Sequence, residues 1–274
     1  MTAKKTIYLD YNIFESYRAN DVEGLRAVVN ALKDEHVLPY SPAHMEDLAS
    51  SLAWQEFGED EIKAVLERCE SRLQNVIDIS KMVEVFPGQG HKPTRMIEEH
   101  PGACLVRVLD HFDRNRLLEV RERELLKQIK ATDAEGARAT RMSNLPVDFL
   151  SDPEYALQLQ KKFEASRELM NNKREAGLTD LKWPSISRSH AVLEHVFEIL
   201  MNYLEEVRFR PEKVKNSRTR MHDVTHAIYA TKADVFVTGD DRFCHKARVA
   251  YHYLGVPTEV LSLEVFIKHY GSSL

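Results

Sequence analysis

The chain has little of what a disulfide-linked, zinc-binding or membrane-spanning protein requires. Only three cysteines occur in 274 residues, which is too few and too scattered for a disulfide framework or a zinc site. No apolar run approaches the roughly 18 residues of a membrane span, and the polar start Met-Thr-Ala-Lys-Lys lacks the apolar core of a secretory signal. We therefore expect a cytoplasmic protein with reduced thiols and no membrane contact.

The chain also lacks an excess of positive charge. It has 38 Lys and Arg residues against 43 Asp and Glu residues, for a net charge of −5, so the total charge does not favour a nucleic-acid binder. Local basic clusters matter more than the total, because a metal site would account for several of the acids. The length allows one large domain or two small ones with ample core.

The most informative stretch is Arg220 to Phe243, which predicts a helix followed by a strand. The helix has one small, apolar face. The strand is a β-branched and aromatic run, typical of a strand buried on both faces. The residues concerned are Val224, Ala227, Ile228 and Ala230, then Val235, Phe236 and Val237. Asp223 lies in the first turn of this helix, and Asp240 follows the strand, where open α/β sheets place their ligands.

A matching half lies at the start of the chain. Thr6–Leu9 predicts a strand, and Asp10 stands at its carboxyl end. Most aspartates at strand ends are turn or cap residues. Asp10, Asp223 and Asp240 together nevertheless offer oxygen ligands for one hard cation, which favours Mg²⁺ or Mn²⁺.

These segments resemble the PIN-domain nucleases. The resemblance rests on Ile-Tyr-Leu-Asp-Tyr-Asn near the start, on Asp223 through Ala227, and on Val-Thr-Gly-Asp ending at Asp240. It covers roughly residues 5–80 and 215–270, and the order and spacing of the motifs make it more specific than any single motif. In that family the acids bind divalent metal and hydrolyse RNA phosphodiester bonds.

The family has a second acid on an early helix, and two residues compete for that position. Ser41-Pro42 predicts the start of this helix, with Ser as N-cap and Pro at the first helical position. Family members place the acid directly before a Leu, which selects Asp47 over Glu46, although Glu is the more usual residue type. We favour Asp47. Both residues also suit the helix dipole without any functional role.

The resemblance implies an α/β, PIN-like fold in which helices flank a central, mostly parallel β-sheet. The PIN-like nuclease domain would comprise residues 1–86 and 208–274, and residues 87–207 would form an inserted helical subdomain. The clearest helical stripe of the chain lies within this insertion, from Leu193 to Leu204.

Three shorter elements are expected from local pattern. His36–Tyr40 predicts a second strand. Helical spacing of apolar residues continues from Asn12 to Leu32, and a single further helix is expected from Tyr155 to Met170.

Basic residues crowd just before Asp223, as Arg208, Arg210, Lys213, Lys215, Arg218 and Arg220. They are either a solvated linker or a means of holding phosphates near the acids. We expect substrate-binding residues at Asn12, Thr238, Arg218, Arg220 and Arg242. Asp241 is either a further ligand or a surface residue. For His44 and His226 we favour a structural role over contact with substrate.

The sequence therefore predicts a metal-dependent ribonuclease, of the toxin-like, defence or housekeeping kind, with catalytic Asp10, Asp47, Asp223 and Asp240. Asp10, Asp223 and Asp240 would bind Mg²⁺ or Mn²⁺, with Asp47 on a second ion or a water. The partner would be RNA, with a homodimer or a cognate protein as further options. A catalytically silent PIN-like module that binds RNA or protein is the main alternative, and a purely structural protein is the third. A phosphatase of the haloacid-dehalogenase type would need an aspartate where this chain has Asn12.

Overall fold

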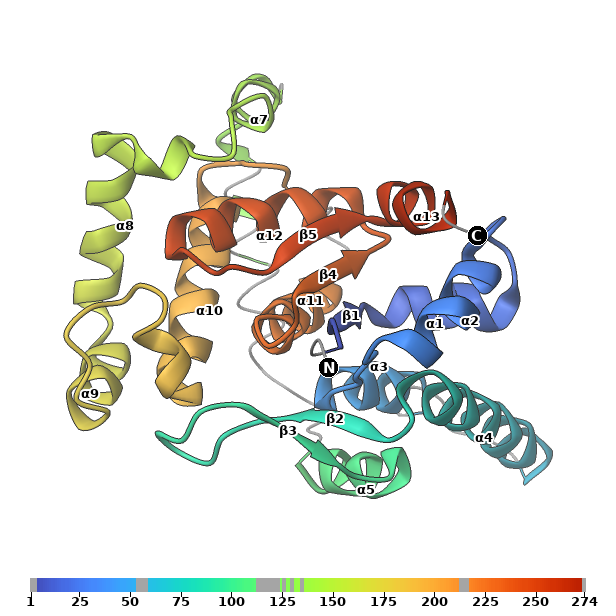
Figure 1. Ribbon diagram of the computed structural model, residues 1–274. Helices are drawn as coiled ribbons and strands as arrows, with labels where there is room; N and C mark the ends of the chain where they lie inside the picture. The colour runs from blue at the N-terminus through green and yellow to red at the C-terminus, as the bar shows by residue number, and fades with distance from the viewer. Residues whose placement is uncertain are drawn as a thin grey trace.

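A parallel sheet of three strands lies at the centre of the computed structural model, which describes residues 4–52, 59–111, 124, 127–128, 131–133, 136–211 and 217–272. The strands are β1 (Ile7–Leu9), β4 (Val235–Thr238) and β5 (Glu259–Ser262), in the order β1-β4-β5. Helices flank this sheet (Figure 1). The chain therefore has the mixed α/β fold expected from the sequence.

The two faces of the sheet contact different hydrophobic clusters, because successive side chains of a strand point to opposite faces. Tyr8, Phe236 and Val260 belong to one cluster, and Ile7, Leu9, Val235, Val237 and Leu261 belong to the other. All three strands are thus buried on both sides, as a parallel sheet requires.

The second of these clusters includes residues of the helices from the first third of the chain and of the C-terminal helix. These helices are α1 (Tyr11–Ala19), α2 (Leu25–Glu35), α3 (Pro42–Leu52), α4 (Glu59–Ser80) and α13 (Leu263–Gly271). The helical spacing from Asn12 to Leu32 does not form one helix. Asn20 ends α1 in the left-handed conformation (φ 55°), and Gly24 precedes α2 with φ 78°.

A second, antiparallel sheet consists of β2 (Val83–Phe86) and β3 (Arg95–Glu98), followed by α5 (Pro101–His111). The expected strand at His36–Tyr40 forms only two isolated parallel bridges, from Thr6 to Val37 and from Tyr40 to Glu84. Pro39 lies between these bridges and has no N–H to donate, which interrupts a continuous ladder.

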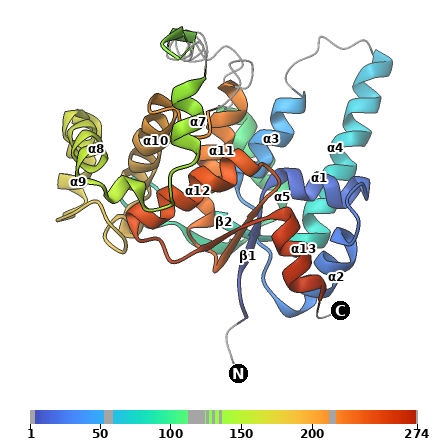
Figure 2. The ribbon, with the colours of Figure 1, turned by 90° about the horizontal axis from the view of Figure 1, so that it is seen from above.

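The helical part of the insertion lies on the other side of the central sheet (Figure 2). It contains α7 (Ala137–Ser143), η1 (Phe149–Ser151), α8 (Pro153–Ala165), α9 (Arg167–Glu175), η2 (Ile186–Arg188) and α10 (His190–Glu206). The single helix expected from Tyr155 to Met170 is two helices. Ser166 has an extended backbone, and its hydroxyl caps α9 by accepting from the Leu169 N–H at 3.3 Å.

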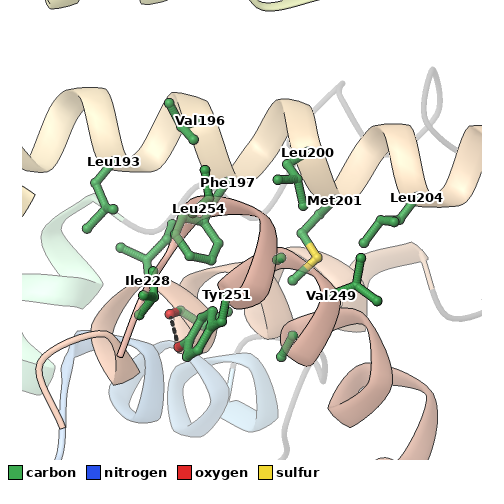
Figure 3. Packing of buried hydrophobic residues seen from close by; sticks show 14 of the residues in the cluster. Leu193, Val196, Phe197, Leu200, Met201, Leu204, Ile228, Val249, Tyr251 and Leu254 are labelled. Atoms are coloured by element: carbon green, nitrogen blue, oxygen red, sulfur yellow. Dashed lines mark hydrogen bonds between the residues drawn. The ribbon is translucent and has the colours of Figure 1, made fainter. Parts of the chain in front are cut away.

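Helix α10 shares a core with the helices that follow it, α11 (Ser217–Ala230) and α12 (Asp241–Leu254). The apolar stripe expected from Leu193 to Leu204 faces Ile228 and Leu254 (Figure 3). Tyr251 donates from its hydroxyl to the Ala227 carbonyl at 2.6 Å and so joins α12 to α11. The helices of the expected insertion therefore share one core cluster with α11 and α12.

The first elements of the expected insertion, β3 and α5, contact a different part of the structure from its later helices. β3 pairs with β2, and α5 packs against α3 and α4. Within the part of the chain that the structure describes, no helix combines the length and apolar character needed to cross a bilayer.

Candidate active site

Asp10 follows β1 and is the N-cap of α1, and the residue is 4% exposed. Its backbone N–H donates to the Val237 carbonyl at 2.9 Å, so the parallel ladder fixes its place. Oδ1 accepts from the Tyr11 N–H at 2.7 Å, and Oδ2 accepts from the Asn12 amide at 3.0 Å. Oδ2 also accepts from the Thr238 hydroxyl at 2.7 Å.

Thr238 connects Asp10 to Asp240. Its buried hydroxyl donates to Asp10 and accepts from the Asp240 N–H at 3.2 Å. The Asn12 side chain strengthens this connection, because its Oδ1 accepts from the Gly239 N–H at 3.2 Å. The structure therefore brings together the two strand-end aspartates, which are 230 residues apart in the sequence.

Asp240 also has an ordinary local role. Its Oδ1 accepts from the Phe243 N–H at 2.9 Å and caps α12. Asp10 and Asp240 are thus both helix N-caps, a structural role that is the usual alternative to a functional one for aspartates at strand ends. One cap hydrogen bond uses only part of the acceptor capacity of a carboxylate, which has about four lone-pair sites.

His226 of α11 lies between two of the predicted catalytic acids. Its Nε2 is 2.9 Å from Asp47 Oδ2 and 3.5 Å from Asp10 Oδ1, and its side chain is 1% exposed. Because a carboxylate only accepts hydrogen bonds, Nε2 carries a hydrogen. Burial lowers the pKa of His226, but the charge of Asp10 and the hydrogen bond and charge of Asp47 outweigh burial and raise it. The raised pKa favours a protonated, positively charged His226 between the acids.

The pKa of Asp10 responds to the same surroundings. Burial raises it above its ordinary value, while the charge of His226 and the Thr238 hydrogen bond act in the opposite direction. A buried carboxylate of this kind needs a neighbouring cation to stay ionised.

A buried hydrogen-bond chain fixes the orientation of His226. The Tyr8 hydroxyl is 2.8 Å from His226 Nδ1 and 2.6 Å from Ser41 Oγ. His44 lies beyond them. Its Nε2 donates to the Leu9 carbonyl at 2.8 Å, and its Nδ1 accepts from the Ser41 N–H at 3.1 Å. Burial and the charge of His226 lower the pKa of His44 to about 3, so this imidazole is neutral.

The two candidates for the second acid both face α11. Asp47 bonds directly to His226, and the charge of the half-buried Glu46 also raises the pKa of His226 with a smaller effect. Asp47, the preferred candidate, is thus the one in hydrogen-bond contact with a residue that approaches Asp10.

Asp223 is half-buried on α11, three residues before His226, so the two share a helix face. It lines a small pocket between α10, α11 and α12, whose residues are Met201, Glu205, Asp223, Val224, Phe243 and Lys246. Lys246 and Glu205 form a buried ion pair in this pocket. Phe243, whose N–H Asp240 caps, connects the pocket to the strand-end acids.

The predicted substrate-binding residues have different surroundings. Asn12 and Arg242 are exposed, while Thr238 is buried beneath them in hydrogen bonds. Asp241 is exposed, with Oδ1 3.8 Å from His245 Nε2. Arg218 and Arg220 lie in the first turns of α11, and their side chains fall outside what the structure describes, as do residues 212–216.

The described residues contain one group of His, Cys, Asp and Glu whose ligand atoms all lie within 4.8 Å of one another. It is Glu84, Glu99 and Cys104, not the predicted acids. Arg107 already neutralises it, at 2.8 Å from Glu84 and 2.6 Å from Glu99. The oxygen ligands of Asp10, Asp223 and Asp240 still match the donor preference of Mg²⁺ or Mn²⁺, although side-chain movement must bring them closer.

Comparison with known proteins adds no assignment. No protein-family model, no curated protein and no solved structure matches this chain. The function must therefore be argued from the residues of the site.

The predicted site residues Asp10 and Asp47 lie on either side of His226, for which we expected a structural role. Its burial and its hydrogen bonds agree with that expectation, and its contacts with both acids connect it to the predicted site. Its spacing of three from Asp223 was the available signal, because residues three apart on a helix lie side by side.

Proposed function

We propose that this chain is a divalent-metal-dependent ribonuclease with a PIN-like fold and a helical insertion. The observation that supports the proposal best is the link from Asp10 through the Thr238 hydroxyl to the Asp240 N–H. It places two acids at the carboxyl edge of a parallel sheet, the usual position of ligands in α/β folds.

The metal would be Mg²⁺ or Mn²⁺, held by Asp10, Asp223 and Asp240, with Asp47 on a second ion or a water. When bound, such an ion activates water and stabilises the negative charge that develops on the phosphate during hydrolysis. No cysteine or neutral histidine is needed in this set, which suits a hard cation.

The residues around the acids have positioning roles in this proposal. Thr238 and Asn12 fix the Asp10 carboxylate through two hydrogen bonds to Oδ2. His226 holds Asp47 on the side of α3 that faces Asp10. Preorganised carboxylates of this kind lower the cost of forming a metal site.

A specific observation favours a second candidate, a catalytically silent PIN-like module that binds RNA or protein. Asp10 already has four hydrogen-bond donors near its two oxygens, from Tyr11, Asn12, Thr238 and His226. The positive charge of His226 can replace that of the proposed Mg²⁺ or Mn²⁺, and the site would then hold no catalytic metal. The two candidates differ in whether metal binds at Asp10.

Cleavage of a labelled single-stranded RNA with and without Mn²⁺ tests the proposal. We expect metal-dependent cleavage by the parent chain and a loss of at least about 100-fold in Asp10→Asn and Asp240→Asn, the scale of a lost electrostatic stabiliser. Asp21→Asn is the control, since Asp21 is exposed in the loop between α1 and α2. Equal cleavage by all four proteins would show that the activity does not reside at these acids, and no cleavage by any of them would favour the silent module.

A further inference from the structure

Basic side chains continue from the acids along one face of α12. Arg242, His245 and Arg248 follow Asp240 on α12. They are spaced three residues from one to the next, so they lie along the same side of the helix. Arg242 is exposed, and His245 and Arg248 are half-buried. Arg248 donates from Nε to the Val260 carbonyl at 3.0 Å, which fixes its guanidinium group beside β5.

Arg210 adds a positive charge from outside α12. It follows α10 in the left-handed conformation (φ 46°), and its N–H donates to the Ser143 hydroxyl at 3.2 Å. Its Nε is buried and has no hydrogen-bond partner. Among the residues that the structure describes, no carboxylate forms an ion pair with Arg210. None of these carboxylates therefore neutralises its charge.

These basic groups surround His245. Arg210 follows Phe209, whose ring lies 5.1 Å from that of Phe149 in η1, and η1 packs against α12. In keeping with this packing, burial and then the charges of Arg210 and Arg248 lower the pKa of His245. Asp241 acts in the opposite direction, with Oδ1 3.8 Å from His245 Nε2. Among the described residues, the surface beside His245 thus carries two arginines and the exposed Asp241.

We propose that Arg210, His245 and Arg248 form a phosphate-binding subsite that holds an RNA strand beside the acids. Phosphate oxygens are the usual ligands of arginines in nucleic-acid complexes, where such contacts position the strand without reading its sequence. His245 follows Asp240 by five residues, about 7.5 Å along the helix axis, so one strand can reach both the acids and this subsite. The identity of the ligand rests on the proposed nuclease function.

The subsite also gives the insertion a part in substrate binding. Arg210 is held in place by Ser143 at the end of α7, and η1 packs against α12. A minimal domain without these elements would keep Arg210, His245 and Arg248 but would lose the Ser143 hydroxyl that holds the backbone of Arg210.

Binding without cleavage tests this inference. The parent for this experiment is the full chain with Asp240→Asn, which retains an N-cap side chain on α12. The affinity for a fluorescein-labelled single-stranded RNA is measured by fluorescence anisotropy over a series of NaCl concentrations. We expect Arg210→Gln and Arg248→Gln each to reduce the slope of log affinity against log salt concentration by about 0.7, the value for one phosphate contact on a single strand.

Arg167→Gln is the matched control, because Arg167 is exposed at the start of α9, away from α12 (Figure 1). Single-stranded DNA of the same sequence should show the same reductions, because the contacts are to phosphates. Slopes of both variants equal to that of Arg167→Gln would overturn the subsite, and so would an absence of RNA binding. Arg248→Gln keeps the test decisive if Arg210→Gln misfolds.

This experiment separates the subsite from the nuclease proposal. A chain that binds RNA through Arg210 and Arg248 but never cleaves it retains the subsite and loses the nuclease function. If the chain cleaves RNA but neither substitution changes the salt dependence of its RNA affinity, the nuclease function is retained and the subsite is overturned.

Discussion

The Thr238 hydroxyl, at the end of β4, donates a hydrogen bond of 2.7 Å to Oδ2 of Asp10, at the end of β1. Among the described hydrogen bonds between side chains, it is the shortest that joins these two strand ends. The Thr238 hydroxyl oxygen also accepts from the Asp240 backbone N–H. One buried hydroxyl therefore holds the Asp10 carboxylate and the backbone of Asp240, so its removal should affect stability and activity together.

Thr238→Val tests this role, because valine has nearly the same shape but no hydroxyl. It leaves an Asp10 lone pair and the Asp240 N–H without their partner, which should cost about 1–3 kcal/mol of unfolding free energy. Cleavage of RNA should fall as well. Thr238→Ser keeps the hydroxyl and is the control. If urea denaturation gives Thr238→Val the stability of the parent, the hydroxyl does not hold the acids.

His226→Leu tests whether His226 stands in for a cation. Removing the imidazole leaves Asp10 and Asp47 without their shared positive neighbour, and breaking a buried charge pair typically costs about 3–5 kcal/mol. Added Mn²⁺ should restore part of this loss, because a cation that binds only the folded protein raises its stability. We expect the rise of the melting temperature with Mn²⁺ to be larger in His226→Leu than in the parent.

The matched control for this experiment is His252→Leu, at an exposed histidine on α12. Its melting temperature should show the same Mn²⁺ response as that of the parent. An equal response in His226→Leu and His252→Leu would contradict a cation site between Asp10 and Asp47.

His44 should make the protein sensitive to acid. Its pKa is lowered to about 3 from a reference value of 6.5, chiefly by burial. Below pH 6.5 the unfolded chain therefore binds a proton that the folded protein does not, and folding stability falls as the pH falls. One such proton corresponds to about 1.4 kcal/mol per pH unit.

The pH dependence of His226 has the opposite sign and a different window. Its raised pKa stabilises the fold at pH values below the unfolded pKa, and that contribution is lost as the pH rises through the folded pKa. Between pH 4 and 6.5, the unfolding free energy from chemical denaturation should therefore change less steeply with pH in His44→Asn than in the parent. An equal pH dependence in both proteins would mean that His44 is protonated in the folded state.

Leu200→Ala tests whether the insertion is part of the fold. Leu200 is fully buried on α10, in the core cluster shared with α11 and α12. Its truncation should cost about 2–5 kcal/mol of unfolding free energy, and the protein should still unfold in a single cooperative transition. The control Leu157→Ala, at a side chain that is 53% exposed on α8, should cost about 0.5 kcal/mol or less. A separate, early transition in Leu200→Ala would indicate an insertion that unfolds independently.

Local pattern was enough to predict the elements that carry the site. The β-branched run at Val235–Val237 correctly predicted a buried strand, and Asp10 and Asp240 follow the parallel strands β1 and β4 at the carboxyl edge of the sheet. The proximity of these acids follows from topology alone, because the carboxyl ends of parallel strands meet at one edge.

Hydrogen bonds between side chains of different helices could not be predicted from the sequence. The pairing of His226 with Asp47 depends on how α11 packs against α3, and helical spacing gives the face of a residue but not its partner. The expected strand at His36–Tyr40 had suitable side chains, but its proline prevented a continuous ladder. The metal arrangement of Asp10, Asp223 and Asp240 stays a prediction.

Anomalous scattering from a crystal soaked in Mn²⁺ tests the central claim most directly. The account predicts an anomalous peak in contact with the carboxylates of Asp10 and Asp240, with Asp223 or Asp47 beside it. A peak only at Glu84 and Glu99, or none at a Mn²⁺ concentration of about 10 mM, near the weak end of protein sites for hard cations, would contradict it.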